Sequence, residues 1–198
     1  MDIQSMRKLF SITTVLQIIL IGGCSNQSES NDIDIVDKMP GSNVVEVMLI
    51  DNIDEARGYC LDVAGGQGAR APIERGLQAH TCYHYKDTIL EDQGFDPVQI
   101  KDGQFRLAYF DVCVTVSSFS AGVPIALAPC DASVNQQFEL TADGRIVPQS
   151  EPALCITVSD TQKKEGRGGT PVHVMRPVSL QPCSDSSQPY QTWMLNSL

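Results

Sequence analysis

A threefold repeat built on cysteine residues constrains the fold of this chain more than any other sequence feature. Three cysteines each begin a short Cys-x-[Asp/Thr]-Val segment, and three others each end an apolar run. The two kinds alternate strictly along the chain, in the order Cys60, Cys82, Cys113, Cys130, Cys155 and Cys183. Spacing alone cannot choose among the pairings that six cysteines allow. The alternation of contexts favours one disulfide within each repeat: Cys60–Cys82, Cys113–Cys130 and Cys155–Cys183.

Each repeat continues past its second cysteine to a Gln-x-aromatic segment. The three segments are Gln93 to Phe95, Gln136 to Phe138 and Gln191 to Trp193. A repeat of this length is too small to bury its own apolar face, so the three copies are expected to share one core. A ring at the same place in each repeat buries a large apolar area there. The Gln amide can pair with backbone groups of the adjoining loop.

Together, the three cysteine pairs and the three Gln-x-aromatic segments resemble the ricin B-type lectin family, whose Q-x-W repeats form a β-trefoil. The resemblance covers about residues 45–198 and implies an all-β fold, a single β-trefoil of three repeats with one disulfide in each. The three lobes are expected over residues 45–98, 99–140 and 141–198. In lobe three, residues 160–171 form a polar, Gly-rich insertion with Lys163, Lys164 and Arg167, which we expect to be a solvated surface loop.

In the resembled lectins, a lobe binds sugar through one set of positions. An Asp lies two residues after the first cysteine, a polar and an aromatic residue precede the second cysteine, and a polar residue precedes the Gln of Q-x-W. The carboxylate accepts charge-assisted hydrogen bonds from sugar hydroxyls. Carried over by position, the resemblance assigns to lobe one Asp62, Gln78, His80, Asp92 and Gln93. His80 replaces the stacking aromatic residue, and Tyr83, His84 or Tyr85 could offer a ring instead.

Lobes two and three lack the carboxylate. The equivalent residues are Thr115, Ala126, Ala128, Asn135 and Gln136 in lobe two, and Thr157, Ser179, Gln181, Tyr190 and Gln191 in lobe three. We therefore expect a sugar site in lobe one only. Two alternatives stay open: Asp62 could bond backbone amides of its own loop, and the extra stretch of residues 65–75 could cover or reshape the pocket.

The N-terminal segment has the pattern of a secretion signal. Two basic residues precede an apolar stretch at residues 9–21, which is shorter than the ~20 residues that a membrane-spanning helix needs. The ending Ile-Gly-Gly-Cys24 resembles the lipobox of bacterial lipoproteins, which implies cleavage after residue 23 and lipid attachment to the Cys24 sulfur. Residues 24–44 then form a lipidated cysteine and a flexible acidic tether. Ser25 implies sorting to the outer membrane if the source is Gram-negative.

Composition and motifs exclude several classes of function. Lys and Arg number 14 against 24 Asp and Glu, a formal net charge of −10, and nucleic-acid binding needs a basic surface instead. The chain has no CxxC, nucleophile elbow, H-E-x-x-H or P-loop, so we expect no metal, no cofactor and no catalysis.

We expect a non-catalytic carbohydrate-binding protein, with a glycan or glycoconjugate as its partner and membrane contact through the lipid anchor only. One alternative is a trefoil without sugar binding that contacts a partner protein, as in toxin binding subunits. Another is a hydrolase with an unrecognised site.

Overall fold

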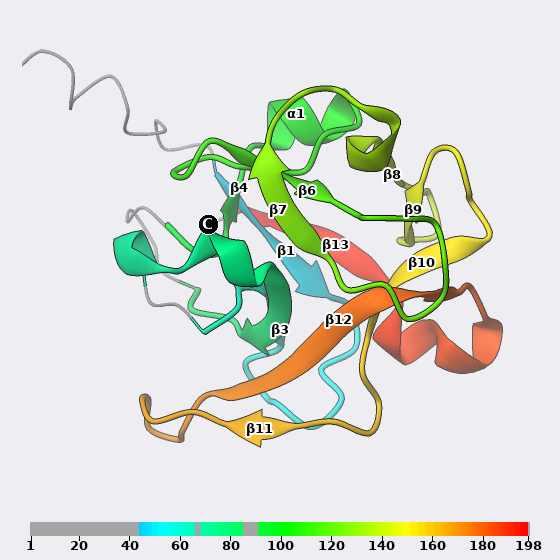
Figure 1. The fold of residues 1–198 in the computed structure, drawn as a ribbon. Coiled ribbons are helices and arrows are strands. Elements are labelled where there is room, and N and C mark those ends of the chain that lie inside the picture. The colour runs from blue at the N-terminus through cyan, green and yellow to red at the C-terminus, as the bar shows by residue number, and fades with distance from the viewer. Residues whose placement is uncertain (1–43, 66–67, 85–90, 198) are drawn as a thin grey trace, which may run out of the picture. The chain divides into compact units, whose positions relative to one another are not determined.

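The computed structural model describes residues 44–65, 68–84 and 91–197. The expected signal, the tether and the lipidated Cys24 lie outside the described residues. Short strands joined by turns make up most of the regular structure, with one short α-helix, α1 (Pro97–Lys101), in the described ranges. The predicted all-β fold is confirmed (Figure 1). No helix in the described part of the chain combines the length and hydropathy needed to span a bilayer.

Within the described residues, each repeat contributes four strands to the trefoil. The first repeat holds β1 (Val45–Leu49), β2 (Tyr59–Val63), β3 (Leu77–Thr81) and β4 (Gly94–Phe95). The second holds β5 (Arg106–Leu107), β6 (Val112–Thr115), β7 (Ala126–Pro129) and β8 (Phe138–Leu140). The third holds β9 (Ile146–Pro148), β10 (Leu154–Val158), β12 (Val174–Pro182) and β13 (Trp193–Ser197), while β11 (Lys164–Glu165) is an extra strand inside the insertion.

Short 3-10 helices fill several connections between these strands. They are η1 (Gly68–Arg70), η2 (Ile73–Arg75), η3 (Val134–Gln136) and η4 (Asp185–Tyr190). The first two lie in the extra stretch of lobe one, between β2 and β3. Helix α1 begins after Asp96, whose side chain accepts hydrogen bonds from the backbone of Val98 and Gln99 as an N-cap.

The second and third strands of each repeat form an antiparallel hairpin: β2 with β3, β6 with β7, and β10 with β12. A disulfide joins the first strand of each hairpin to the residue just after its second strand, and the predicted pairs Cys60–Cys82, Cys113–Cys130 and Cys155–Cys183 are all confirmed. Strand β1 pairs with β13 along its whole length, so the first and last repeats meet. The three lobes therefore share one core.

The aromatic residue of each Gln-x-aromatic segment lies in that core. Phe95 and Phe138 are 0 % exposed and Trp193 is 1 % exposed. The Phe138 ring packs edge-on against Phe105, with 6.4 Å between the ring centroids. The indole N–H of Trp193 donates to the carbonyl of Ile156 at 3.1 Å, so the larger ring is buried without leaving its donor unpaired.

The Gln side chain of each segment holds the backbone around the second cysteine of its repeat. In all three lobes its Nε2 donates to the carbonyl just before that cysteine, and its Oε1 accepts from the N–H just after it. These carbonyl and N–H partners are Thr81 and Tyr83 for Gln93, Pro129 and Asp131 for Gln136, and Pro182 and Ser184 for Gln191. The six distances lie between 2.9 and 3.2 Å. A sequence motif thus becomes a repeated structural contact.

Strand β12 departs from the threefold pattern. It has 9 residues, against 5 in β3 and 4 in β7. Its C-terminal half pairs with β10, whereas its N-terminal half pairs with β3 of lobe one and with β11. Lobe three therefore extends across lobe one, as the long orange strand beside β3 shows in Figure 1.

Candidate functional site

The residues that sequence analysis assigned to lobe one lie together. Asp62 and Gln78 face each other across the β2–β3 hairpin. The Gln78 amide donates to Asp62 Oδ1 at 2.9 Å, and the Gln93 amide donates to Asp62 Oδ2 at 3.0 Å. The Asp92 carbonyl accepts from the backbone N–H of Val63, next to Asp62. The hairpin and the Gln-x-aromatic segment thus bring one polar cluster together.

Asp62 is the centre of this cluster and is only 1 % exposed. Burial raises the pKa of its carboxyl well above the usual value, and the nearby charge of Asp92 raises it further, while the two amides act in the opposite direction. The two side-chain amides, rather than loop backbone, hold its oxygens. The predicted direct contact between Asp62 and a sugar stays a prediction.

A cavity of about 840 Å³ opens beside this cluster, within the range of about 300–1,000 Å³ typical of small-molecule sites. One wall comes from lobe one and comprises Gly65, Gly68, His80, Tyr83, Glu91 and Asp92. The other wall comes from lobe three and comprises residues 165–169 with His173 and Met175. His80 and Asp92 therefore reach the cavity, whereas Asp62, Gln78 and Gln93 are outside its lining.

Three rings gather at the cavity. The His80 ring centroid lies 5.3 Å from that of Tyr83 and 5.1 Å from that of His173, and Tyr83 and His173 are 5.7 Å apart. His80 Nδ1 lies 2.8 Å from the Thr81 carbonyl, so Nδ1 carries the proton and Nε2 of the neutral ring is an acceptor. Burial lowers the pKa of both His80 and His173. Both rings are therefore uncharged at neutral pH.

The structure distinguishes among the residues that could supply the stacking ring in place of the missing aromatic residue. Tyr83 lines the cavity. His84 instead contacts Glu46, with Nδ1 3.1 Å from Oε2, and the carbonyl of Arg57, 2.6 Å from Nε2. Tyr85 lies outside the described residues.

Asp92 connects the extra stretch of lobe one to the site. Its buried Oδ2 accepts a hydrogen bond from the backbone N–H of Gly68 at 2.7 Å, and the Tyr83 hydroxyl lies 3.5 Å away. Burial raises the pKa of the Asp92 carboxyl, although the bond from Gly68 opposes that change. Gly65 and Gly68 line the cavity, so the extra stretch contributes part of its wall.

Lobe three also forms a cavity, of about 500 Å³. Its lining includes all five equivalent residues, Thr157, Ser179, Gln181, Tyr190 and Gln191, together with Asp160. Sequence analysis placed this exposed carboxylate in the insertion of lobe three and not among the sugar-binding positions of that lobe. In lobe two, the Thr115 hydroxyl donates to the Asn135 carbonyl of the same lobe at 3.4 Å. Buried carboxylates and the ring cluster, rather than a cavity as such, therefore distinguish lobe one.

The closest group of metal-ligand atom types in the described ranges is Glu46, Cys60 and Cys82. The two cysteines form a disulfide, so neither offers a thiolate to a metal ion.

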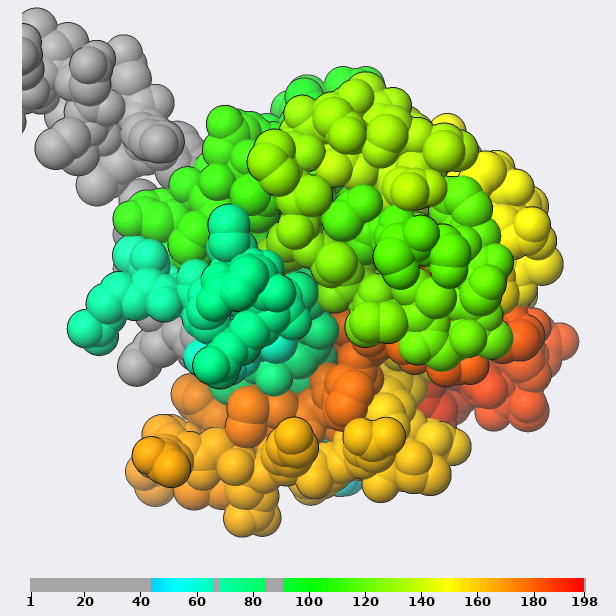
Figure 2. All heavy atoms as spheres, in the orientation of Figure 1, coloured from blue at the N-terminus to red at the C-terminus, as the bar shows by residue number. Residues whose placement is uncertain are grey.

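Sequence analysis did not identify the lobe-three wall of the cavity. The insertion is exposed, as expected, yet Glu165 to Gly169 also line the site. Figure 2 shows these lobe-three residues in orange, beside the lobe-one residues in teal. The sequence carried one signal of this longer lobe-three loop: the cysteines of the third pair are 28 residues apart, against 22 and 17 in the other two pairs.

Solved structures with a similar fold include proteins solved in complex with a sugar. The C-half of an earthworm R-type lectin, solved with GalNAc, is 15 % identical with a TM-score of 0.52, and the match covers 78 % of this chain and 98 % of that one. A non-toxic homologue of type II RIPs from Momordica charantia (bitter gourd), solved with alpha-methyl-D-galactoside, is 17 % identical with a TM-score of 0.52, over 78 % of this chain and 48 % of that one. At these identities the likeness shows the fold. Comparison with curated protein sequences returns no match.

The family model of the ricin-type beta-trefoil lectin domain matches residues 47–175. That range includes the two disulfides of lobes one and two, the lobe-one polar cluster and both walls of its cavity. The chain belongs to the ricin-type beta-trefoil lectin domain family.

Proposed function

We propose that this protein is a non-catalytic carbohydrate-binding protein that takes a glycan into the lobe-one cavity. One observation carries the proposal: the cavity opens at His80 and Asp92, two of the residues that the family pattern assigns to sugar contact. The sugars bound by the similar earthworm and bitter gourd proteins support the ligand class.

The lining offers the contacts that a sugar needs. Asp92 presents a carboxylate whose hydrogen bonds to hydroxyls are charge-assisted when it is ionised. His80 Nε2 is an acceptor, and the rings of His80 and Tyr83 offer faces to the apolar C–H side of a pyranose. Asp62 does not line the cavity; it accepts hydrogen bonds from the Gln78 and Gln93 amides and so fixes their positions. A single-lobe contact of this kind is weak, so many copies on one surface would raise the avidity.

The same proposal places these copies on a membrane. Cleavage after residue 23 and lipidation of Cys24 would attach the trefoil through two acyl chains, without a transmembrane helix. Radiolabelled palmitate supplied to cells should label the wild-type protein and leave Cys24→Ser unlabelled. Equal labelling of both proteins, or none in the wild type, contradicts the anchor.

A glycan array with the purified protein tests the ligand class. Binding to no glycan favours the protein-interaction alternative. For a glycan that binds, isothermal titration of Asp92→Asn locates the site, because this change gives lobe one the residue that lobe two carries as Asn135. Loss of one hydrogen bond to a charged group should weaken binding by about 10- to 100-fold.

Two control variants complete the titration. Asn135→Ala and Asp160→Asn, in lobes two and three, should bind as the wild type does. Selective loss in Asp160→Asn, with Asp92→Asn unaffected, would move the site to the lobe-three cavity.

A further inference from the structure

We propose that lobe three completes the lobe-one site, and that His173 is a specificity-determining residue that extends the ring cluster of His80 and Tyr83 and contacts the ligand beside them. This inference rests on the proposed glycan site in lobe one. It turns a site within one repeat into a site shared by two repeats, in which the sugar lies against the adjoining rings of His80 and His173.

Strand pairing puts His173 in place. The N-terminal half of β12 runs antiparallel to β3, with Met175 opposite His80 and Arg176 opposite Ala79. The Val174 backbone N–H donates to Thr81 Oγ1 at 2.9 Å, and this hydroxyl is buried. His173 immediately precedes this contact, and its ring lies edge-on to that of His80. The sheet ladder and this hydrogen bond therefore hold the chain immediately after His173, and its own backbone bonds Gly166 and Gly168 of the insertion.

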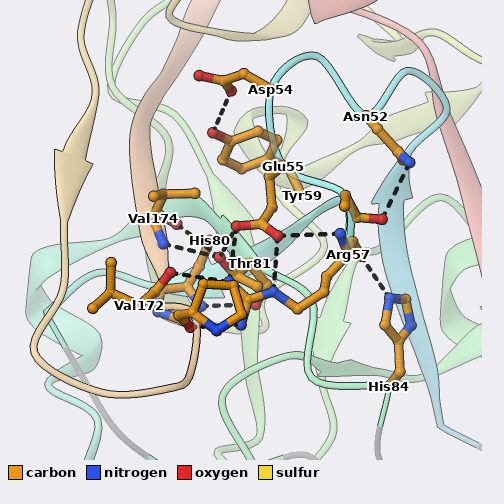
Figure 3. Close-up of polar contacts among 12 residues, drawn as sticks. Asn52, Asp54, Glu55, Arg57, Tyr59, His80, Thr81, His84, Val172 and Val174 are labelled. Atoms are coloured by element: carbon orange, nitrogen blue, oxygen red, sulfur yellow. Dashed lines mark hydrogen bonds and ion pairs between the residues drawn. The ribbon is translucent and has the colours of Figure 1, made fainter.

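Arg57 of lobe one holds the chain just before His173. Its guanidinium donates to the Pro171 carbonyl at 3.0 Å and to the Val172 carbonyl at 2.9 Å. Glu55 orients the guanidinium through two further bonds, of 2.8 and 2.9 Å, and is held in turn by Thr81 at 3.2 Å. Figure 3 shows these side chains converging on Val172 and Val174. Arg57 is a positioning residue for this wall.

A second group holds the other end of the insertion. Arg176 donates to the Ser159 carbonyl at 2.9 Å and to Asp54 at 3.0 Å. Lys163, inside the insertion, donates to the same Asp54 carboxylate at 2.8 Å. Lobe one therefore fixes the insertion at both ends, and the loop between them forms a preformed wall of the cavity.

The charges of the lining indicate the class of ligand. Glu91, Asp92 and Glu165 are acidic, Arg167 is basic, and both imidazoles are uncharged at neutral pH. An anionic terminal sugar would meet an excess of acidic groups. The cavity therefore fits a neutral terminal sugar whose C–H face meets the imidazole rings.

The test compares His173→Ala, His173→Phe and Lys164→Ala in titrations with a neutral glycan hit. Lys164 is exposed, lies in the same insertion and is outside the cavity lining, which makes it the matched control. Loss of the ring should weaken binding by about 3- to 10-fold. His173→Phe, which keeps a ring, and Lys164→Ala should stay within about 2-fold of the wild type.

Arg57→Lys tests the positioning role, because Lys keeps the charge but loses the two-pronged contact with the loop. It should weaken binding as His173→Ala does, and the double variant should be no weaker than either single one, since both changes remove the same contact. Full additivity would assign Arg57 a role apart from His173.

The outcomes separate the two proposals. If His173→Ala binds as the wild type does while Asp92→Asn loses the glycan, the contact from lobe three is wrong and the lobe-one site stands. If the wild type binds no glycan, both proposals fail. Tighter binding of the same glycan carrying a terminal carboxylate would overturn the neutral ligand class. Thermal unfolding confirms that each variant is folded, and His173→Phe decides the case should His173→Ala be unstable.

Discussion

Lobes one and two share one structural frame, which consists of the disulfide and the Gln-to-backbone hydrogen bonds around its second cysteine. They differ in the polar residues that contact this frame. In both, the Gln of the Gln-x-aromatic segment bonds the carbonyl before and the N–H after the second cysteine. Only lobe one adds a buried carboxylate to that Gln, through Asp62 at 3.0 Å from Gln93. Its counterpart Thr115 bonds a backbone carbonyl instead. Contacts shared by the lobes therefore maintain the fold, and contacts confined to lobe one point to function.

Lobe three lies between these cases. Thr157 Oγ1 accepts from the Gln191 amide at 2.9 Å, where lobe one has the carboxylate. The lobe keeps its own cavity and also lends a wall to that of lobe one. Repeats with one frame can thus specialise by small substitutions and by one insertion.

The largest effect should come from the shared frame, in the disulfides. Replacing both cysteines of Cys60–Cys82 or of Cys113–Cys130 by Ala should each lower the free energy of unfolding by about 2–5 kcal/mol. The two losses should differ by less than about 1 kcal/mol, because the separations of 22 and 17 residues are similar. Urea unfolding measures both. A much larger loss in one lobe would show that the frames are not equivalent.

A smaller effect is expected from the three Gln residues. Gln93→Ala, Gln136→Ala and Gln191→Ala each leave backbone groups beside a cysteine unpaired, which should cost about 1–3 kcal/mol. Gln136→Ala should cost least, because Gln136 has fewer side-chain partners. Gln93 also bonds Asp62 and Gln191 also bonds Thr157, each two places after the first cysteine of its repeat, and Gln136 makes no equivalent bond among the described residues. Chemical denaturation ranks the three variants. A negligible loss for Gln191→Ala would contradict a structural role shared by all three.

Asp62→Thr gives lobe one the residue of the other lobes and should change pH dependence more than stability. The folded-state pKa of Asp62 is raised above its ordinary value of 3.8, so the folded protein holds this proton more tightly than the unfolded chain does. Its contribution to stability is therefore greatest below about pH 4 and falls as pH rises above that value. The wild type should lose stability relative to Asp62→Thr over this rise. Parallel pH curves from thermal unfolding would contradict the raised pKa.

The sequence predicted what depends on contacts within one repeat. The disulfides join cysteines 22, 17 and 28 residues apart, and the polar cluster around Asp62 forms across one hairpin and the segment after it. The disulfides recur in all three repeats, and the cluster occupies positions that the family resemblance assigns within one repeat, so both could be identified from the sequence.

The sequence could not predict what depends on contacts between repeats. His173 reaches the site because Val174 bonds Thr81, 93 residues earlier, and because Arg57 bonds the carbonyl of Val172, 115 residues later. Each of these contacts occurs once, so no repeat reveals it. The burial of Asp62 is likewise a property of the assembled cluster rather than of its motif.

The most direct test of a lobe-one glycan site follows the imidazole proton resonances by NMR while a glycan hit is titrated. The chain has 3 histidines; His80 and His173 line the cavity, and His84 contacts Glu46 and the Arg57 carbonyl instead. Single His→Gln variants assign the signals. The account predicts that the His80 and His173 resonances shift with the glycan while the His84 resonance stays in place. Saturable glycan binding with the His80 and His173 resonances unmoved would contradict it.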